Sequence, residues 1–120
     1  CVGLLMEYIG NVLKDSKVKA VASGAIANGK PVIVNSNGTV SVVSGSNLTS
    51  ENFIGFADNA YADGADAFIN STCAIDRNQS SLTAGQKYFV QTDGTLSETA
   101  DDPSVEAGIA ISATEILIKG

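Results

Sequence analysis

The sequence predicts an all-β domain, a small β-barrel or sandwich built from two duplicated hairpin-plus-strand halves after a short N-terminal extension. Three observations predict this fold class. Two turn dipeptides, Asn37-Gly38 and Asp93-Gly94, each separate runs rich in β-branched and aromatic residues. The segments around the two turns are similar to each other, and helical spacing of apolar residues occurs only near the start. The 120 residues suit one domain with its own apolar core.

The first 20 residues differ from the rest of the chain. Their large apolar residues are spaced as on one face of a helix, and these are Leu4, Leu5, Tyr8, Ile9, Val12 and Leu13. The same residues also suit a strand, because glycines interrupt the helical pattern. Such an apolar stretch is unfavourable on a soluble monomer. We therefore expect residues 1–20 to be an assembly arm ahead of a duplicated domain at 21–120; the alternative is a cap on its own barrel.

Each hairpin is predicted from its turn. Asn-Gly and Asp-Gly tolerate positive φ at both central positions, which a two-residue type I′ turn requires. The first hairpin turns at Asn37 and Gly38, and the second turns at Asp93 and Gly94. We expect positive φ at both glycines and type I′ geometry in both turns.

The two hairpins are copies of one another. Residues 29–41 align without a gap with residues 85–97, at an offset of 56 residues. The identical pairs are Gly29/Gly85, Val34/Val90, Gly38/Gly94, Thr39/Thr95 and Ser41/Ser97. An internal repeat indicates one structural unit used twice. The sequence therefore predicts two halves, at about residues 25–70 and 81–119.

The likeness continues downstream of the hairpins. Residues 54–57, which read IGFA, correspond to residues 107–110, which read AGIA. A short apolar strand follows in each half, at residues 67–69 and at residues 116–118. Each half is thus expected to contain a hairpin, a loop, a glycine-marked strand and a final strand.

The composition argues against an enzyme. The chain has no His, which removes Ser-His-Asp triads, Cys-His pairs and His-ligated zinc. Its 13 acidic and 7 basic residues give a net charge of −6, so the protein repels phosphate backbones. The apolar stretch at its start is too short to cross a bilayer. We expect no enzymatic activity, no catalytic residues and no cofactor, and neither nucleic acid nor membrane as a partner.

Two further features of the sequence are weak candidates for sites. The acidic residues within 58–66 resemble a calcium loop only loosely, since the alternating ligands and closing Glu of an EF-hand are absent, and we expect no metal site. Cys1 and Cys73 allow one disulfide at most, and Cys73 is interpreted as a buried or idle thiol. Cys1 is compatible with a lipidated terminus, with residues missing upstream, or with a true start at Met6.

The second repeat resembles modules of tailed-phage virion proteins. The resemblance rests on residues 82–97, which read LTAGQKYFVQTDGTLS, and on residues 107–119, which read AGIAISATEILIK. Such modules occur in tail-fibre and head-fibre proteins, and the wider order is similar to that of small head-decoration proteins, which are compact β-barrels. The resemblance covers about residues 25–119 and brings no active-site residues with it.

The resemblance implies a structural role on the virion surface, that is, on an extracellular particle. The expected protein is a non-enzymatic capsid-decoration or tail-fibre component, a homo-oligomer, often a trimer, that contacts other virion proteins. One alternative is a host- or carbohydrate-binding tip in which Tyr61 and Tyr88 stack on sugar, which requires both rings to face outward in one groove. The other alternative is a bacterial surface or filament subunit.

Overall fold

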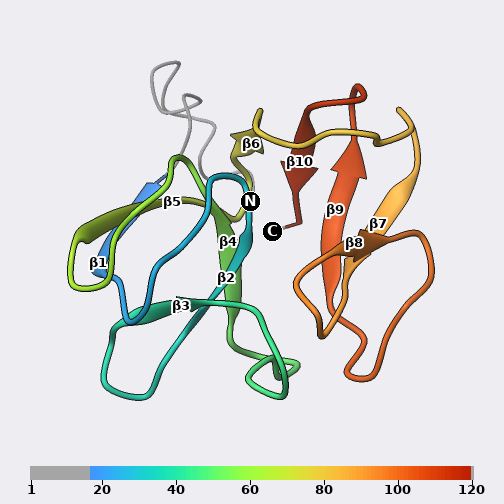
Figure 1. Ribbon diagram of the computed structural model, residues 1–120. Coiled ribbons are helices and arrows are strands. Elements are labelled where there is room, and N and C mark those ends of the chain that lie inside the picture. Colours follow the sequence, from blue (N-terminus) through green and yellow to red (C-terminus); the bar gives the residue numbers. More distant parts are fainter. Residues whose placement is uncertain (1–16, 120) are drawn as a thin grey trace, which may run out of the picture.

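A computed structural model describes residues 17–119 and shows two five-stranded antiparallel sheets in that part of the chain. The strands are β1 (Lys17–Val21), β2 (Pro31–Val34), β3 (Val40–Val42), β4 (Phe53–Ala57), β5 (Asp66–Ser71), β6 (Ile75–Asp76), β7 (Lys87–Val90), β8 (Leu96–Ser97), β9 (Glu106–Ala110) and β10 (Ile116–Ile118). Sheet 1 has the order β1-β5-β4-β2-β3, and sheet 2 has the order β6-β10-β9-β7-β8 (Figure 1). The predicted all-β fold class is confirmed.

Sheet 2 repeats sheet 1 strand by strand. Each strand of sheet 1 has its counterpart five strands later, and the counterparts occupy the same places in the two sheets. The second strand of each half also carries the same irregularity where it pairs with the fourth. The register shifts between Val32 and Ile33 in β2, and between Tyr88 and Phe89 in β7. The duplication predicted from the hairpins therefore extends to the whole of both sheets.

One detail of the predicted alignment is wrong. Gly55 pairs with Ser71, and its counterpart Gly108 pairs with Ile118. Ile118 therefore corresponds to Ser71, two residues beyond Ile69, with which the sequence pattern aligned it. A slip of two residues keeps every side chain on the same face of its strand. The alternation of apolar residues could not reveal it.

Both hairpins form, but their turns are not of the predicted type. Gly38 and Gly94 have φ of 87° and 86°, which confirms the expected positive values. Asn37 and Asp93 are not among the described residues with positive φ, although type I′ requires it at both central positions. Each hairpin instead has a three-residue loop, a type I turn followed by a glycine in the left-handed region.

A side-chain acceptor explains the turn type. In the first hairpin, Asn37 Oδ1 accepts hydrogen bonds from the backbone N and the hydroxyl of Thr39, at 3.2 and 2.7 Å. In the second, Asp93 Oδ1 accepts the same two bonds from Thr95, at 3.0 and 2.6 Å. Asn and Asp commonly bond in this way to the backbone two residues on. The bonds hold Asn37 and Asp93 without requiring positive φ.

Valine at either turn glycine is expected to lower the free energy of unfolding by about 1–2 kcal/mol, because a β-branched residue is strained at positive φ. The larger loss is expected at Gly94, where an added Cβ would lie 2.6 Å from the carbonyl oxygen of Val43; nothing lies within 4 Å of such a Cβ at Gly38. Thermal unfolding followed by circular dichroism measures both variants. Unchanged melting temperatures would contradict this turn geometry.

The second turn also predicts a pH effect. The hydrogen bonds from the Thr95 hydroxyl and then from its backbone N lower the pKa of Asp93 below its ordinary value of 3.8. A carboxylate with a lowered folded pKa adds stability above its unfolded pKa and loses it as the pH falls through the folded pKa. Asp93→Asn, which copies the first hairpin, should leave stability at neutral pH nearly unchanged and reduce its loss in acid. Melting curves measure this. If acidification lowered the melting temperatures of the wild type and of Asp93→Asn by the same amount, the result would contradict the expectation.

Two apolar clusters organise the packing. The first lies within the first half, and its buried members are Ala22, Ile26, Val32, Val40, Ala57, Ala67 and Ile69. An isolated bridge between Ala22 and Val40 brings the chain after β1 to β3, at the other edge of sheet 1. Sheet 1 thus curls around its own cluster and nearly closes on itself.

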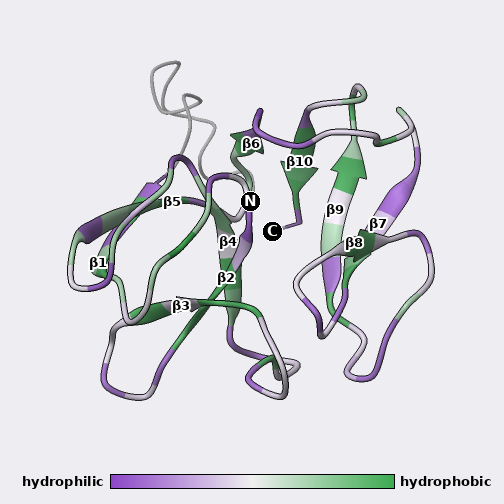
Figure 2. Cartoon of the chain, viewed as in Figure 1, coloured by the Kyte–Doolittle hydropathy of each residue, from purple (hydrophilic) through white to green (hydrophobic). Residues whose placement is uncertain are grey.

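The second cluster joins the two halves. Its buried members in the first half are Ile33, Val43, Leu48 and Phe56, and those after it are Ala74, Tyr88, Val90, Val105, Ala107, Ala110, Ile116 and Ile118. One face of sheet 2 therefore packs against the outside of sheet 1, as in a sandwich. Because side chains alternate along a strand, the other face of sheet 2 points away from sheet 1. Hydrophobic residues occur along β9 and β10 (Figure 2). Both strands include an exposed one, Ile109 in β9 and Leu117 in β10.

The predictions for the N-terminal arm lie outside the described residues. They concern Leu4, Leu5, Tyr8, Ile9, Val12 and Leu13. β1 begins at Lys17, so the expected boundary between residues 20 and 21 falls within a strand of sheet 1. The halves as observed run from β1 to β5 and from β6 to β10.

Candidate functional site at the junction of the two halves

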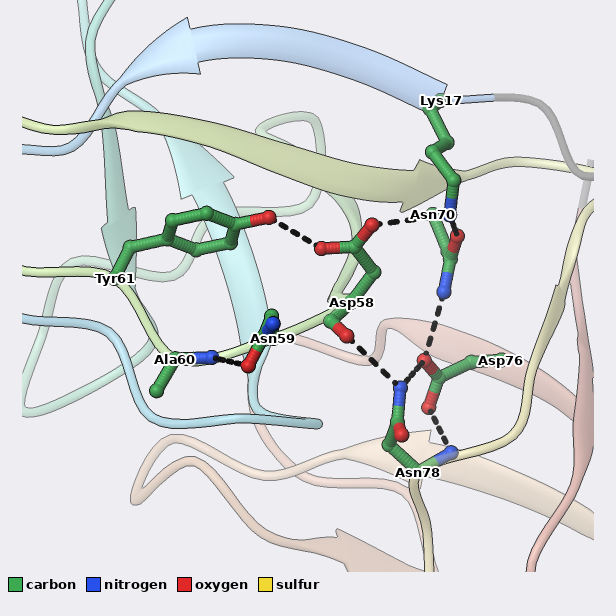
Figure 3. Close-up of polar contacts among 8 residues, drawn as sticks. All are labelled: Lys17, Asp58, Asn59, Ala60, Tyr61, Asn70, Asp76 and Asn78. Atoms are coloured by element: carbon green, nitrogen blue, oxygen red, sulfur yellow. Dashed lines mark hydrogen bonds and ion pairs between the residues drawn. The ribbon is translucent and has the colours of Figure 1, made fainter.

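A buried polar junction centred on Asp76 connects the two sheets. Asp76 is the last residue of β6 and is fully buried. Its carboxylate accepts hydrogen bonds from Asn70 Nδ2 at 3.0 Å and from Gln79 Nε2 at 2.7 Å. Asn78 donates to it through both its backbone N and Nδ2, each at 3.3 Å (Figure 3). These donors offset the cost of burying the carboxylate, and they tie β5, β6 and the following loop together.

Asn70 links this junction to the surface. Its Oδ1 accepts a hydrogen bond from Lys17 Nζ at 2.6 Å, and the same Nζ lies 3.1 Å from Asp58 Oδ2 (Figure 3). Asp58 Oδ1 accepts a hydrogen bond from the Tyr61 hydroxyl. Partial burial, and then this bond, raise the pKa of Tyr61 above 10.0. The tyrosine therefore stays a neutral donor, and the network fixes β1 and the loop after β4 against β5.

The two tyrosines considered for sugar binding do not share a groove. Tyr61 is half-buried beside the cluster of the first half, and its hydroxyl bonds to Asp58. Tyr88 is buried in the cluster that joins the sheets, and its hydroxyl accepts a hydrogen bond from Thr83 N at 2.8 Å. The pair of outward-facing rings that the carbohydrate-binding alternative requires is not formed by these residues.

A cleft of about 420 Å³ lies between the halves. Residues 28–31 of the first half and residues 78–82 line it, together with part of the second hairpin. Its lining has amides, hydroxyls and one cation, Lys30, and no carboxylate. The side chain of Gln79, which follows β6, donates a hydrogen bond through Nε2 to the carbonyl of Gly29 in the first half, at 2.7 Å. At least one polar group of the cleft therefore bonds across the junction and helps to join the two halves.

The acidic residues of the loosely calcium-like segment have structural partners. Asp63 Oδ1 accepts a hydrogen bond from Gly24 N at 2.7 Å. Asp66 lies 3.8 Å from Lys19 Nζ in an exposed ion pair. Within residues 17–119, no three His, Cys, Asp or Glu side chains gather in a way that could hold a metal ion.

The same part of the chain has no helix long and apolar enough to span a membrane.

Cys73 is disulfide-bonded, so its interpretation as an idle thiol is wrong. It lies in the turn between β5 and β6 with φ of 75°, and its backbone N donates to the Ile118 carbonyl at 3.1 Å. The only other cysteine of the sequence, Cys1, lies outside the described residues. Two cysteines far apart in sequence offered no spacing pattern from which to predict a bond.

The bond at Cys73 predicts its reactivity. Iodoacetamide is expected to leave Cys73 unmodified in the native protein, because only a thiolate attacks the reagent. Modification should follow once a reductant is added. Peptide mass spectrometry measures both states, and alkylation of Cys73 without reductant would contradict the bond.

The face of sheet 2 that points away from sheet 1 exposes a group of apolar side chains. Leu117 pairs with Ile109 on one side and with Ile75 on the other, which sets three apolar side chains next to each other on one face. Leu117 and Ile109 are 42% and 45% exposed. Ile111, which follows the end of β9 and is 46% exposed, is the next exposed apolar residue along the chain. We call Ile75, Ile109, Ile111 and Leu117 the outer row.

The comparisons with known proteins place the chain in no family. No family model matches it, and no curated protein matches it.

Proposed function

We propose that this protein is a non-enzymatic structural component on the surface of a tailed-phage particle, either a capsid-decoration protein or part of a fibre. It acts through contacts with copies of itself, as a homo-oligomer for which we expect a trimer, and with other virion proteins. The phage assignment rests on the resemblance of residues 82–97 and 107–119. The assembly role rests on one observation, the apolar outer row exposed on a folded body.

The use of polar groups supports a structural role. Asp76 and Asn70, the buried polar residues of the described chain, have their hydrogen bonds within the protein. No buried side-chain nitrogen or oxygen between residues 17 and 119 lacks a partner. A catalytic site instead holds polar groups ready for a substrate. Folding explains the buried polar groups, whereas the outer row is a surface feature that the packing of residues 17–119 does not explain.

Mass spectrometry of density-purified phage particles tests the virion assignment. Peptides of this chain are expected in the particles, in many copies per particle for a decoration protein and in few copies for a fibre. Recovery only in the soluble cell fraction would contradict the proposal. Recovery with bacterial envelopes, free of particles, would favour the bacterial surface or filament subunit.

A further inference from the structure

The two sheets use corresponding faces in different ways. In sheet 1, the counterparts of Leu117 and Ile109 are Asn70 and Phe56, which pair with each other as Leu117 and Ile109 do. Asn70 and Phe56 are 3% and 0% exposed, because Phe56 packs in the cluster that joins the sheets and Asn70 bonds to Asp76. The same face of sheet 2 has no such cover among the described residues. The corresponding face therefore occurs in both sheets. In sheet 1 it is covered by sheet 2, and in sheet 2 the described residues leave it exposed.

We propose that a second copy of this chain covers the outer row, in a two-fold contact in which each row packs against the other. The inference rests on the proposed association with copies of itself and names the surface and its partner. Because a two-fold contact closes as a dimer, it replaces the expected trimer as the assembly that the outer row builds. A two-fold contact uses the same patch on both subunits, so the patch must be complementary to itself.

The charges around the outer row fit a self-complementary contact. Glu115 and Lys119 immediately precede and follow β10, each two residues from Leu117. Lys119 lies 3.7 Å from Glu106, and Arg77 lies 3.3 Å from Glu115. The rim is therefore balanced in charge, on a chain whose net charge is −6. Two acidic copies repel each other least where opposite charges are paired.

The contact is expected to be weak and reversible. Four side chains per copy cover less area than the roughly 800 Å² per partner of a standard interface. Loss of rigid-body freedom opposes association in addition. The paired state should therefore form at high protein concentration and dissociate on dilution.

Sedimentation velocity of the full chain over a range of concentrations tests the contact. Leu117→Lys and Ile109→Lys each place a charge in the apolar contact, and each is expected to raise the dissociation constant at least tenfold. The matched control is Val34→Lys, because Val34 is 36% exposed but lies on sheet 1, away from the outer row. This control should associate like the wild type. Circular dichroism melting curves verify that all three variants are folded.

Dilution followed by NMR locates the contact independently. The amide shifts of the outer row should change with concentration, and those of Val34 should not. Association that the two lysine variants leave unchanged would place the contact elsewhere, which overturns this inference and leaves the assembly role standing. If deletion of residues 1–16 moves these shifts and dilution does not, the chain's own N-terminal segment covers the row and the two-fold contact is wrong. A wild-type chain that stays monomeric at every concentration overturns both the two-fold contact and the proposed self-association.

Discussion

Alanine in place of Gly108 is expected to lower the free energy of unfolding by at least about 3 kcal/mol, and Gly55→Ala by a similar amount. An added Cβ would lie 2.0 Å from the Leu117 carbonyl oxygen in the first case and 1.9 Å from that of Asn70 in the second. Both oxygens belong to the backbone of the neighbouring strand, so neither moves without disturbing the sheet. The φ values of 151° and 148° add strain for any residue with a side chain.

Gly45→Ala is the matched control for this effect. Gly45 also has positive φ, 58°, but nothing lies within 4 Å of an added Cβ there. Its substitution should therefore show backbone strain alone, about 1–2 kcal/mol. Urea unfolding measures all three variants, and loss of a cooperative transition in Gly55→Ala or Gly108→Ala agrees with the expectation. A loss no larger than that of Gly45→Ala would show that the strands are not this close.

Removal of the Asp76 carboxylate is the second large expected effect. Asp76→Ala deprives Asn70 Nδ2 and Gln79 Nε2 of an acceptor in the buried junction. An unsatisfied buried donor costs about 1–3 kcal/mol, so the variant should lose about 3 kcal/mol or more. Asp76→Asn keeps the shape and one acceptor oxygen, and its loss should be smaller.

Asp66→Ala is the control, because it removes a carboxylate that is exposed and not part of the buried junction. Asp66 is exposed and its ion pair with Lys19 is long, at 3.8 Å. Such surface pairs contribute about 0–1 kcal/mol. Chemical unfolding at neutral pH compares the variants. Equal stability of Asp76→Ala and Asp66→Ala would mean that the junction does not hold the halves together.

The features that the sequence predicted correctly are local ones. Both hairpins follow from a turn dipeptide between β-forming runs, and the positive φ of Gly38 and Gly94 follows from the same dipeptides. The duplication was visible because each half repeats these local signals in the same order. The turn type was wrong because it depends on a side-chain bond from Asn37 or Asp93, which the dipeptide alone does not show.

The features that the sequence did not predict depend on side-chain bonds and on packing that the pattern of residue types does not show. By register, the counterpart of Asp76 in the first half is Val18, so the repeat gave no sign of a buried acid. Asn70 and Gln79 lie only six and three residues from Asp76, but neither a turn dipeptide nor the alternation of apolar residues shows that their side chains bond to its carboxylate. Exposure of the outer row was equally hidden, since the sequence marks Ile109 and Leu117 as apolar but does not show which face of sheet 2 meets sheet 1.

The mass of the wild-type full chain in solution shows directly whether this protein associates with copies of itself. Light scattering after size-exclusion chromatography measures that mass at several loading concentrations. We expect it to rise with concentration to a multiple of the 12.2 kDa chain. A single species of 12.2 kDa at every concentration would contradict this expectation.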